Sequence, residues 1–139
     1  MKIQLHPQIL ELEKKFSDEK NQSFSISDNQ KLYEYGLLYS EALSEYNYLD
    51  DLRKIIKDMK FLEIKKIGEA KTDKLAEAIS RTSDEYRQCI EKRKDYEKLK
   101  CQLSAKMTYI KGEIQSKNND AISRAVQQKY SATSGEGQY

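Results

Sequence analysis

The sequence predicts an all-α protein built around a long antiparallel helical hairpin with coiled-coil-like arms, which we expect to form oligomers. Of its 139 residues, 37% are hydrophobic and 35% are charged, a balance typical of long helices with a thin core and solvated outer faces. The only proline is Pro7, so none interrupts a helix after the chain's start. Leu, Ile and Tyr recur at helical spacing, and ten tyrosines are too many for a disordered chain.

The N-terminal part, residues 1–30, is expected to hold a short helix and a polar linker. Pro7 suits the first turn of a helix that runs to about Phe16, with an apolar stripe along one side. The following residues are rich in Ser, Asn and Asp, which compete with the hydrogen bonds of a helix. We therefore predict a linker there, in which Phe24 and Ile26 could act as anchors.

The hairpin itself is expected to cover residues 31–130, and its first arm has clear ends. Ser27 and Gln30 fit a capping box at the start, and Gly68 is placed to end the helix. Two helices of this size would each be on the order of 60 Å long, and one hairpin of that shape leaves apolar surface exposed. We therefore expect copies of the chain to associate through a tyrosine-rich stripe of the first arm. This predicted oligomer interface consists of Leu32, Tyr35, Tyr39, Ala42, Tyr46, Leu49 and Ile56.

The second arm begins after Thr72 and carries apolar residues down one broad face. One continuous helix is the expected form, although Thr82 and Glu85 make a second capping box that would instead give two helices with a joint near Arg81. Gly112 and the polar residues 116–120 weaken the pattern, so a short final helix is expected up to Tyr130. Residues 131–139 are small and polar, and we expect them to be disordered.

Catalytic and metal-binding residues are not indicated. The single histidine, His6, has no Cys or paired carboxylates beside it in the sequence, and is read as a helix-start residue. The five glycines are scattered and form no phosphate-binding loop. Cys89 and Cys101 are too far apart along one helix for a disulfide and are expected to be buried apolar residues. The sequence thus predicts a protein that is not an enzyme and needs no metal or cofactor.

Membrane segments are not indicated either. No run of residues approaches the roughly 18 to 20 apolar residues of a membrane span, and Pro7 and charges interrupt the N-terminus. We expect a soluble, cytoplasmic protein without a membrane partner.

Charge is unevenly distributed along the chain. Residues 1–50 hold five Lys against nine acidic residues, whereas residues 51–139 hold twenty basic and fourteen acidic residues. Two clusters stand out in the second part, and the six cations of the first have no equivalent acidic cluster beside them. These clusters are Arg53, Lys54, Lys57, Lys60, Lys65 and Lys66, and then Lys92, Arg93 and Lys94, which Lys98 and Lys100 extend.

Cations near aromatic side chains are what a protein uses to bind single-stranded nucleic acid, because cations neutralise phosphates while rings stack on bases. Phe61 and Tyr96 are the rings expected to contribute here. The competing interpretation is that both clusters only keep a charge-rich helix in solution.

The stretch from Tyr39 to Arg124 resembles recombination mediators of the UvsY type, which are small helical proteins of tailed bacteriophages. A tyrosine-rich helix with a basic end precedes a helix that closes on the Asn118 joint and a short amphipathic turn. The resemblance implies a viral protein in the host-cell cytoplasm that binds single-stranded DNA as a homo-oligomer. It also implies a role in DNA recombination, in which the protein helps to load a recombinase onto DNA coated with single-strand-binding protein. Arg53, Lys54, Lys57, Lys60, Lys65 and Lys66 carry over as DNA contacts.

The alternative function is that of a non-enzymatic coiled coil that binds another protein, either as an assembly factor or as a viral inhibitor of a host complex. Binding of single-stranded DNA that weakens steeply with salt would separate the two functions.

Overall fold

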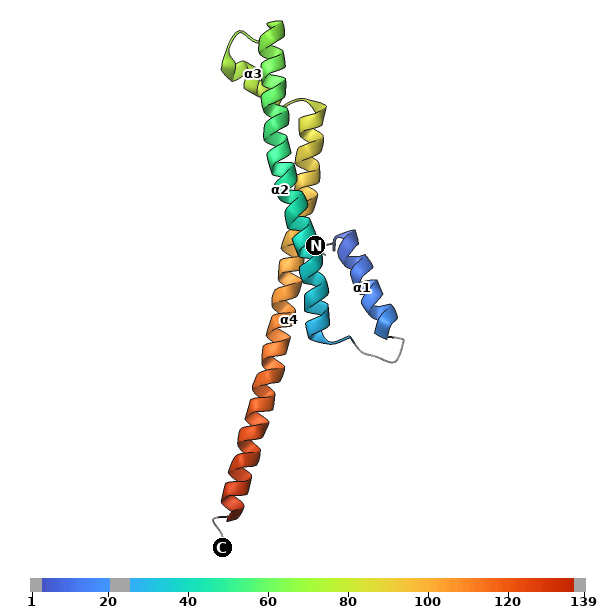
Figure 1. Cartoon of the computed structure of the whole chain (residues 1–139), viewed down its shortest axis with the longest axis vertical. Coiled ribbons are helices and arrows are strands. Elements are labelled where there is room, and N and C mark those ends of the chain that lie inside the picture. The colour runs from blue at the N-terminus through green and yellow to red at the C-terminus, as the bar shows by residue number, and fades with distance from the viewer. Residues whose placement is uncertain (1–3, 21–25, 137–139) are drawn as a thin grey trace.

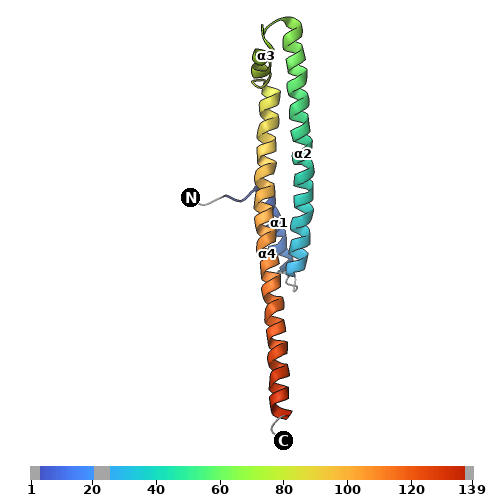
Figure 2. The same cartoon turned by 90° about the vertical axis from the view of Figure 1, so that its left-hand side faces the viewer.

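A computed structural model describes residues 4–20 and 26–136 of the chain and shows an elongated all-α protein (Figure 1). Its helices are α1 (Pro7–Lys20), α2 (Asp28–Ile67), α3 (Asp73–Ser80) and α4 (Asp84–Glu136), and no strand occurs in the described ranges. The antiparallel pair α2 and α4 forms the long axis, α1 lies along one side of it, and α3 sits at the end where α2 turns back (Figures 1 and 2). The predicted all-α hairpin is therefore confirmed.

Both ends of α2 lie where the sequence predicts them. The hydroxyl oxygen of Ser27 accepts a hydrogen bond from the backbone N–H of Gln30 at 3.1 Å, which caps the first turn. At the other end Gly68 adopts φ 73°, and its N–H binds the last free carbonyls of the helix. This left-handed conformation suits glycine, so α2 stops there.

The second arm is not one continuous helix as predicted, because α3 and α4 are separate. Thr72 caps α3 by accepting from the backbone N–H of Leu75. Thr82 does not start α4, since its hydroxyl donates to the carbonyl of Ile79 at 2.6 Å. The cap of α4 is Ser83, which accepts from the N–H of Tyr86. The break lets α3 fold back and bury Ala76 against α2.

Helix α4 is longer than its partner and extends beyond the hairpin. Its apolar packing against the core ends at Ile114, the Lys117 ammonium still pairs with Asp28 at the start of α2, and residues 115–131 are all exposed (Figure 2). The sequence suggested weakening near Gly112 and disorder from residue 131, but the helix continues to Glu136. Residues 116–120 contain neither proline nor a residue with positive φ, so they are compatible with an uninterrupted helix.

The main core lies where three helices meet. Leu99 and Leu103 of α4 are fully buried, together with Ile9 of α1. Phe16 meets Tyr35 edge to face, with ring centroids 5.4 Å apart. Helix α1 ends four residues later than predicted, Ile26 packs against this core as expected, and Phe24 lies outside the described residues.

His6 holds the start of α1 in place. The imidazole is buried, and its Nε2 lies 2.8 Å from a carboxylate oxygen of Asp95 on α4. Its Nδ1 accepts from the backbone N–H of Gln8, so the ring also caps α1, as a helix-start residue should. The residues beside His6 in the sequence do not indicate this neighbour, since the fold brings Asp95 to it from 89 residues away.

The predicted oligomer stripe is largely used within the chain. Tyr35, Ala42 and Leu49 are buried, while Leu32 and Tyr39 pack against the main core. Tyr46 and Ile56 are half-buried. In this conformation the three buried residues of the stripe are covered within the chain, so they are not available to a second copy.

The cysteines differ from each other. Cys89 is buried, and its thiol donates to the carbonyl of Leu49 at 3.2 Å, whereas Cys101 is exposed, so the prediction for Cys101 is wrong. Within the described ranges, no group of three or more His, Cys, Asp or Glu residues is arranged to hold a metal ion. No described helix has both the length and the apolar composition to cross a membrane.

Tyr35 links α1 to α2 through a buried hydroxyl. It donates to a carboxylate oxygen of Glu13 at 3.0 Å, and the same oxygen pairs with the ammonium of Lys106 at 2.7 Å. Burial of the ring raises the pKa of Tyr35 well above its ordinary value of 10.0, and Glu13 raises it further. The hydroxyl therefore stays protonated in the folded chain at a pH where an unfolded tyrosine ionises.

We expect alkaline pH to destabilise the fold through Tyr35. A raised folded pKa gives stability that is complete below pH 10.0 and is lost as the pH rises above it. Tyr35→Phe should cost about 1 kcal/mol near neutral pH and should flatten the fall of the melting temperature between about pH 9.5 and 11.5. The exposed Tyr33 gives the control Tyr33→Phe. Equal pH profiles for both variants would contradict the role assigned to Tyr35.

Candidate nucleic-acid interface

Cations from two helices gather along one flank of the hairpin. Arg53, Lys54 and Lys57 lie on one side of α2, because residues three and four apart share a helix face. The antiparallel register brings Arg93 and Lys100 of α4 beside them, through contacts with Asp50 and Tyr46 of α2. We call these five cations the basic flank.

Asp50 is the centre of the basic flank. Its carboxylate accepts hydrogen bonds from Arg53 at 3.0 Å and from Arg93 of the other helix, and Lys54 lies 3.6 Å away. Hydrogen bonds from the two guanidinium groups lower the pKa of Asp50 below its ordinary value. Asp50 therefore stays ionised and holds the two arginines in fixed positions, while it cancels only one of the charges around it.

Tyr46 provides an aromatic surface within the flank. The Lys100 ammonium lies 4.1 Å from the ring centroid, and the Arg93 guanidinium carbon lies 5.7 Å from it. A hydrogen bond with Glu97 raises the pKa of the Tyr46 hydroxyl, which keeps the ring neutral. With Asp50 and Glu97 as the nearby carboxylates, the five cations leave this flank with a net positive charge.

Two of the lysines predicted to contact DNA form ion pairs with carboxylates of the chain itself. Lys60 lies 3.6 Å from both Glu63 and Glu85, and Lys65 pairs with Asp73 at 2.7 Å. The expectation that these cations lack acidic partners is wrong, because the fold brings Asp73 at the start of α3 and Glu85 of α4 beside them. Within the part of the chain that the structure describes, Lys57 and Lys66 form no ion pair within 4.0 Å.

The two rings expected to stack on bases lie elsewhere. Phe61 packs against the small core beneath α3, with Ile64 and Ala76. Tyr96 packs against the main core and lines a groove on the other side of the hairpin, together with Lys92. Lys94 is exposed on α4. The structure thus keeps Arg53, Lys54, Lys57 and Arg93 of the predicted set together and separates the remainder.

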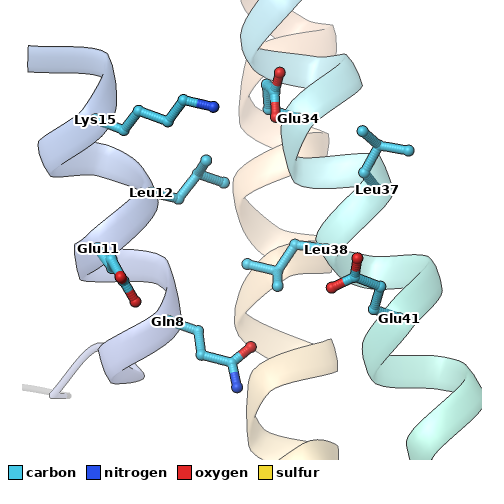
Figure 3. A pocket seen from close by; sticks show the side chains of 8 residues that line it. All are labelled: Gln8, Glu11, Leu12, Lys15, Glu34, Leu37, Leu38 and Glu41. Carbon is cyan, nitrogen blue, oxygen red and sulfur yellow. The ribbon is translucent and has the colours of Figure 1, made fainter.

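The opposite flank is lined with carboxylates. A groove of about 700 Å³ runs between α1 and α2, and Leu12 and Leu38 point toward each other across it (Figure 3). It leads into a second groove of about 680 Å³ between α2 and α4. Across both grooves the acidic lining residues outnumber the basic ones. The acidic residues are Glu11, Glu34, Glu41, Glu45, Glu91 and Asp95, and the basic ones are Lys15 and Lys92.

Comparisons with protein families, with curated proteins and with solved structures find no match for this chain. The relationship to UvsY-type mediators therefore stays a prediction from the sequence pattern. Function has to be inferred from the residues and contacts of the chain itself.

Proposed function

We propose that the protein binds single-stranded DNA along the basic flank, that it does so as a homo-oligomer, and that it assists the loading of a recombinase. The observation that carries this proposal is the convergence of cations from α2 and α4 beside Tyr46. A recombinase and a single-strand-binding protein enter as partners through the resemblance to phage mediators alone.

The chemistry of the flank suits a single strand. Arg53 and Arg93 share a single carboxylate, that of Asp50, so each guanidinium group keeps N–H donors that can bind a phosphate oxygen. Lys54 and Lys57 can neutralise phosphates of a DNA strand that runs along α2. Tyr46 can stack on a base, and base stacking on one aromatic ring contributes about 1 to 3 kcal/mol. This combination of cations and a ring favours single strands without strong sequence preference.

Fluorescence anisotropy with a labelled oligonucleotide of about 15 residues tests the proposal. The logarithm of the association constant should fall linearly with the logarithm of salt concentration, with a slope near −0.7 for each phosphate neutralised. A duplex of the same length should bind more weakly, because its bases cannot reach Tyr46. Absence of binding at low salt, or equal binding of duplex and single strand, would contradict the proposal.

The second candidate is a coiled coil that binds another protein. The ion pairs of Lys60 and Lys65 favour this second candidate, because these lysines can bind phosphates only after the ion pairs break. The carboxylate-lined grooves are a further surface on which a basic protein segment could bind. Lack of any salt-dependent DNA binding would make this candidate the better one.

A further inference from the structure

Helix α2 carries a second apolar stripe beside the one that packs against α4. It consists of Tyr48, Leu52, Ile55, Met59 and Leu62, with successive spacings of four, three, four and three residues. This is the spacing of a coiled-coil seam, in which side chains of two helices interlock. We call these five residues the open stripe.

Most of the open stripe is exposed in the single chain, and Leu52 is half-buried. The exposed fractions of Tyr48, Ile55, Met59 and Leu62 are 61%, 53%, 65% and 66%. The largest apolar patch on a typical monomer measures about 300–600 Å², and large patches of this kind mark interaction sites. Large apolar side chains at seam spacing are costly to leave in water, so the open stripe is expected to be covered.

The open stripe also lies away from the basic flank. Tyr48 and Leu52 line the groove shared with Glu91 and Asp95 on the carboxylate-lined side of the hairpin. Arg53 projects from the other side of α2, toward Asp50, which also binds Arg93, and Lys57 shares that helix face four residues further on. A partner on the open stripe would therefore leave the DNA-binding residues uncovered.

We propose that the open stripe packs against the open stripe of a second copy, with the two α2 helices antiparallel. This rests on the homo-oligomer of the proposed function and names its interface. At the same seam spacing the stripe is preceded by Glu45 and followed by Lys66, both exposed. Antiparallel pairing places the acidic end of one stripe near the basic end of the other, whereas parallel pairing brings like charges together.

Two further observations favour a second copy over an unrelated protein. A seam with spacings of four and three residues needs a partner with the same spacing, and the open stripe supplies it. An isologous contact also buries the stripe of both copies, so the apolar surface removed from water is twice that of one stripe.

Multi-angle light scattering at micromolar concentration is the first test. The wild-type chain should have the mass of a dimer or a multiple of it, and Ile55→Asp should have half the wild-type mass with unchanged helical circular dichroism. The matched control is Tyr109→Asp on α4, where the replaced side chain is 69% exposed and lies outside the stripe. It should keep the wild-type mass. A monomeric wild-type protein, or an Ile55→Asp variant of wild-type mass, would overturn the proposal.

Charge reversal tests the antiparallel arrangement and does not depend on a core substitution. Glu45→Lys should weaken association at low salt by about tenfold or less, since the pair lies at an exposed edge. Adding Lys66→Glu in the same chain should restore it, because the reversed ends again face opposite charges. An unrestored double variant would overturn the antiparallel pairing.

The interface and the DNA site can fail separately. Ile55→Asp should still bind a short oligonucleotide that one subunit can cover, with an affinity within about threefold of wild type, because the basic flank is intact. A wild-type protein that is oligomeric yet does not bind DNA would refute the proposed function and leave the interface standing. A wild-type protein that is monomeric but binds DNA normally would refute the interface and leave the DNA site standing.

Discussion

Replacing Lys54, Lys57 and Lys100 together by Gln is expected to weaken the binding of single-stranded DNA on the order of 100-fold at about 0.1 M salt. All three belong to the basic flank, and none makes a close ion pair that holds the fold together. Each cation that neutralises a phosphate contributes about −0.7 to the log–log salt slope, so three lost contacts should flatten that slope by about two. Anisotropy titrations at four or five salt concentrations measure both quantities.

The matched control removes three lysines elsewhere. Lys71, Lys74 and Lys111 are exposed and lie outside the basic flank, so the triple Gln variant at these sites has the same net charge. It should keep the wild-type slope. If both triple variants lose affinity equally, binding follows net charge and the basic flank is not a site.

Asp50→Asn is a substitution that should raise DNA affinity, whereas the lysine substitutions should lower it. The substitution removes the charge to which Arg53 and Arg93 donate, which leaves both guanidinium groups available to phosphates. DNA affinity should rise, while the melting temperature falls because an ion pair between α2 and α4 is lost. A fall in affinity would mean that the arginines must be held by Asp50 in order to bind.

The two ends of α2 are the part of the fold that local sequence predicts correctly. Ser27 and Gly68 act on backbone groups within four residues of themselves, so their effect can be read without knowledge of the partner helix. The break between α3 and α4 is harder to predict from local sequence. The capping signal was visible, but the hydroxyl of Thr82 is used to end α3, and only the packing of α3 against α2 makes the break favourable.

The candidate site depended on the register of the hairpin, which no local pattern specifies. Arg93 and Asp50 are 43 residues apart, and Tyr46 was assigned to an oligomer stripe because its spacing matched the seam. Because the register is not specified locally, the sequence pattern also put Phe61 and Tyr96 among the predicted DNA contacts. A helix with two apolar stripes gives a periodic signal for each, and only the position of α4 shows which stripe is buried within the chain and which is open.

Leu103→Ala is expected to cause the largest loss of stability among the variants considered. Leu103 is fully buried on α4 and belongs to the cluster that joins α4 to Ile9 of α1 and Tyr35 of α2. Removing its side chain loses apolar burial and leaves a cavity that rigid helices close only in part, which costs about 2–5 kcal/mol. Thermal unfolding followed by circular dichroism should show a melting temperature lower by roughly 5–20 °C.

The same helix offers a matched control for this loss, because the exposed part of α4 has no core beside it. Ile122 is 62% exposed in the segment beyond the hairpin, so Ile122→Ala removes a similar side chain where no cavity can form. Its cost should stay within about 0.5 kcal/mol, since alanine also has the higher helix propensity. Should Ile122→Ala destabilise the protein as much as Leu103→Ala, the extended part of α4 must be packed against another chain in solution. Light scattering on that variant would then show whether a loss of mass accompanies the loss of stability.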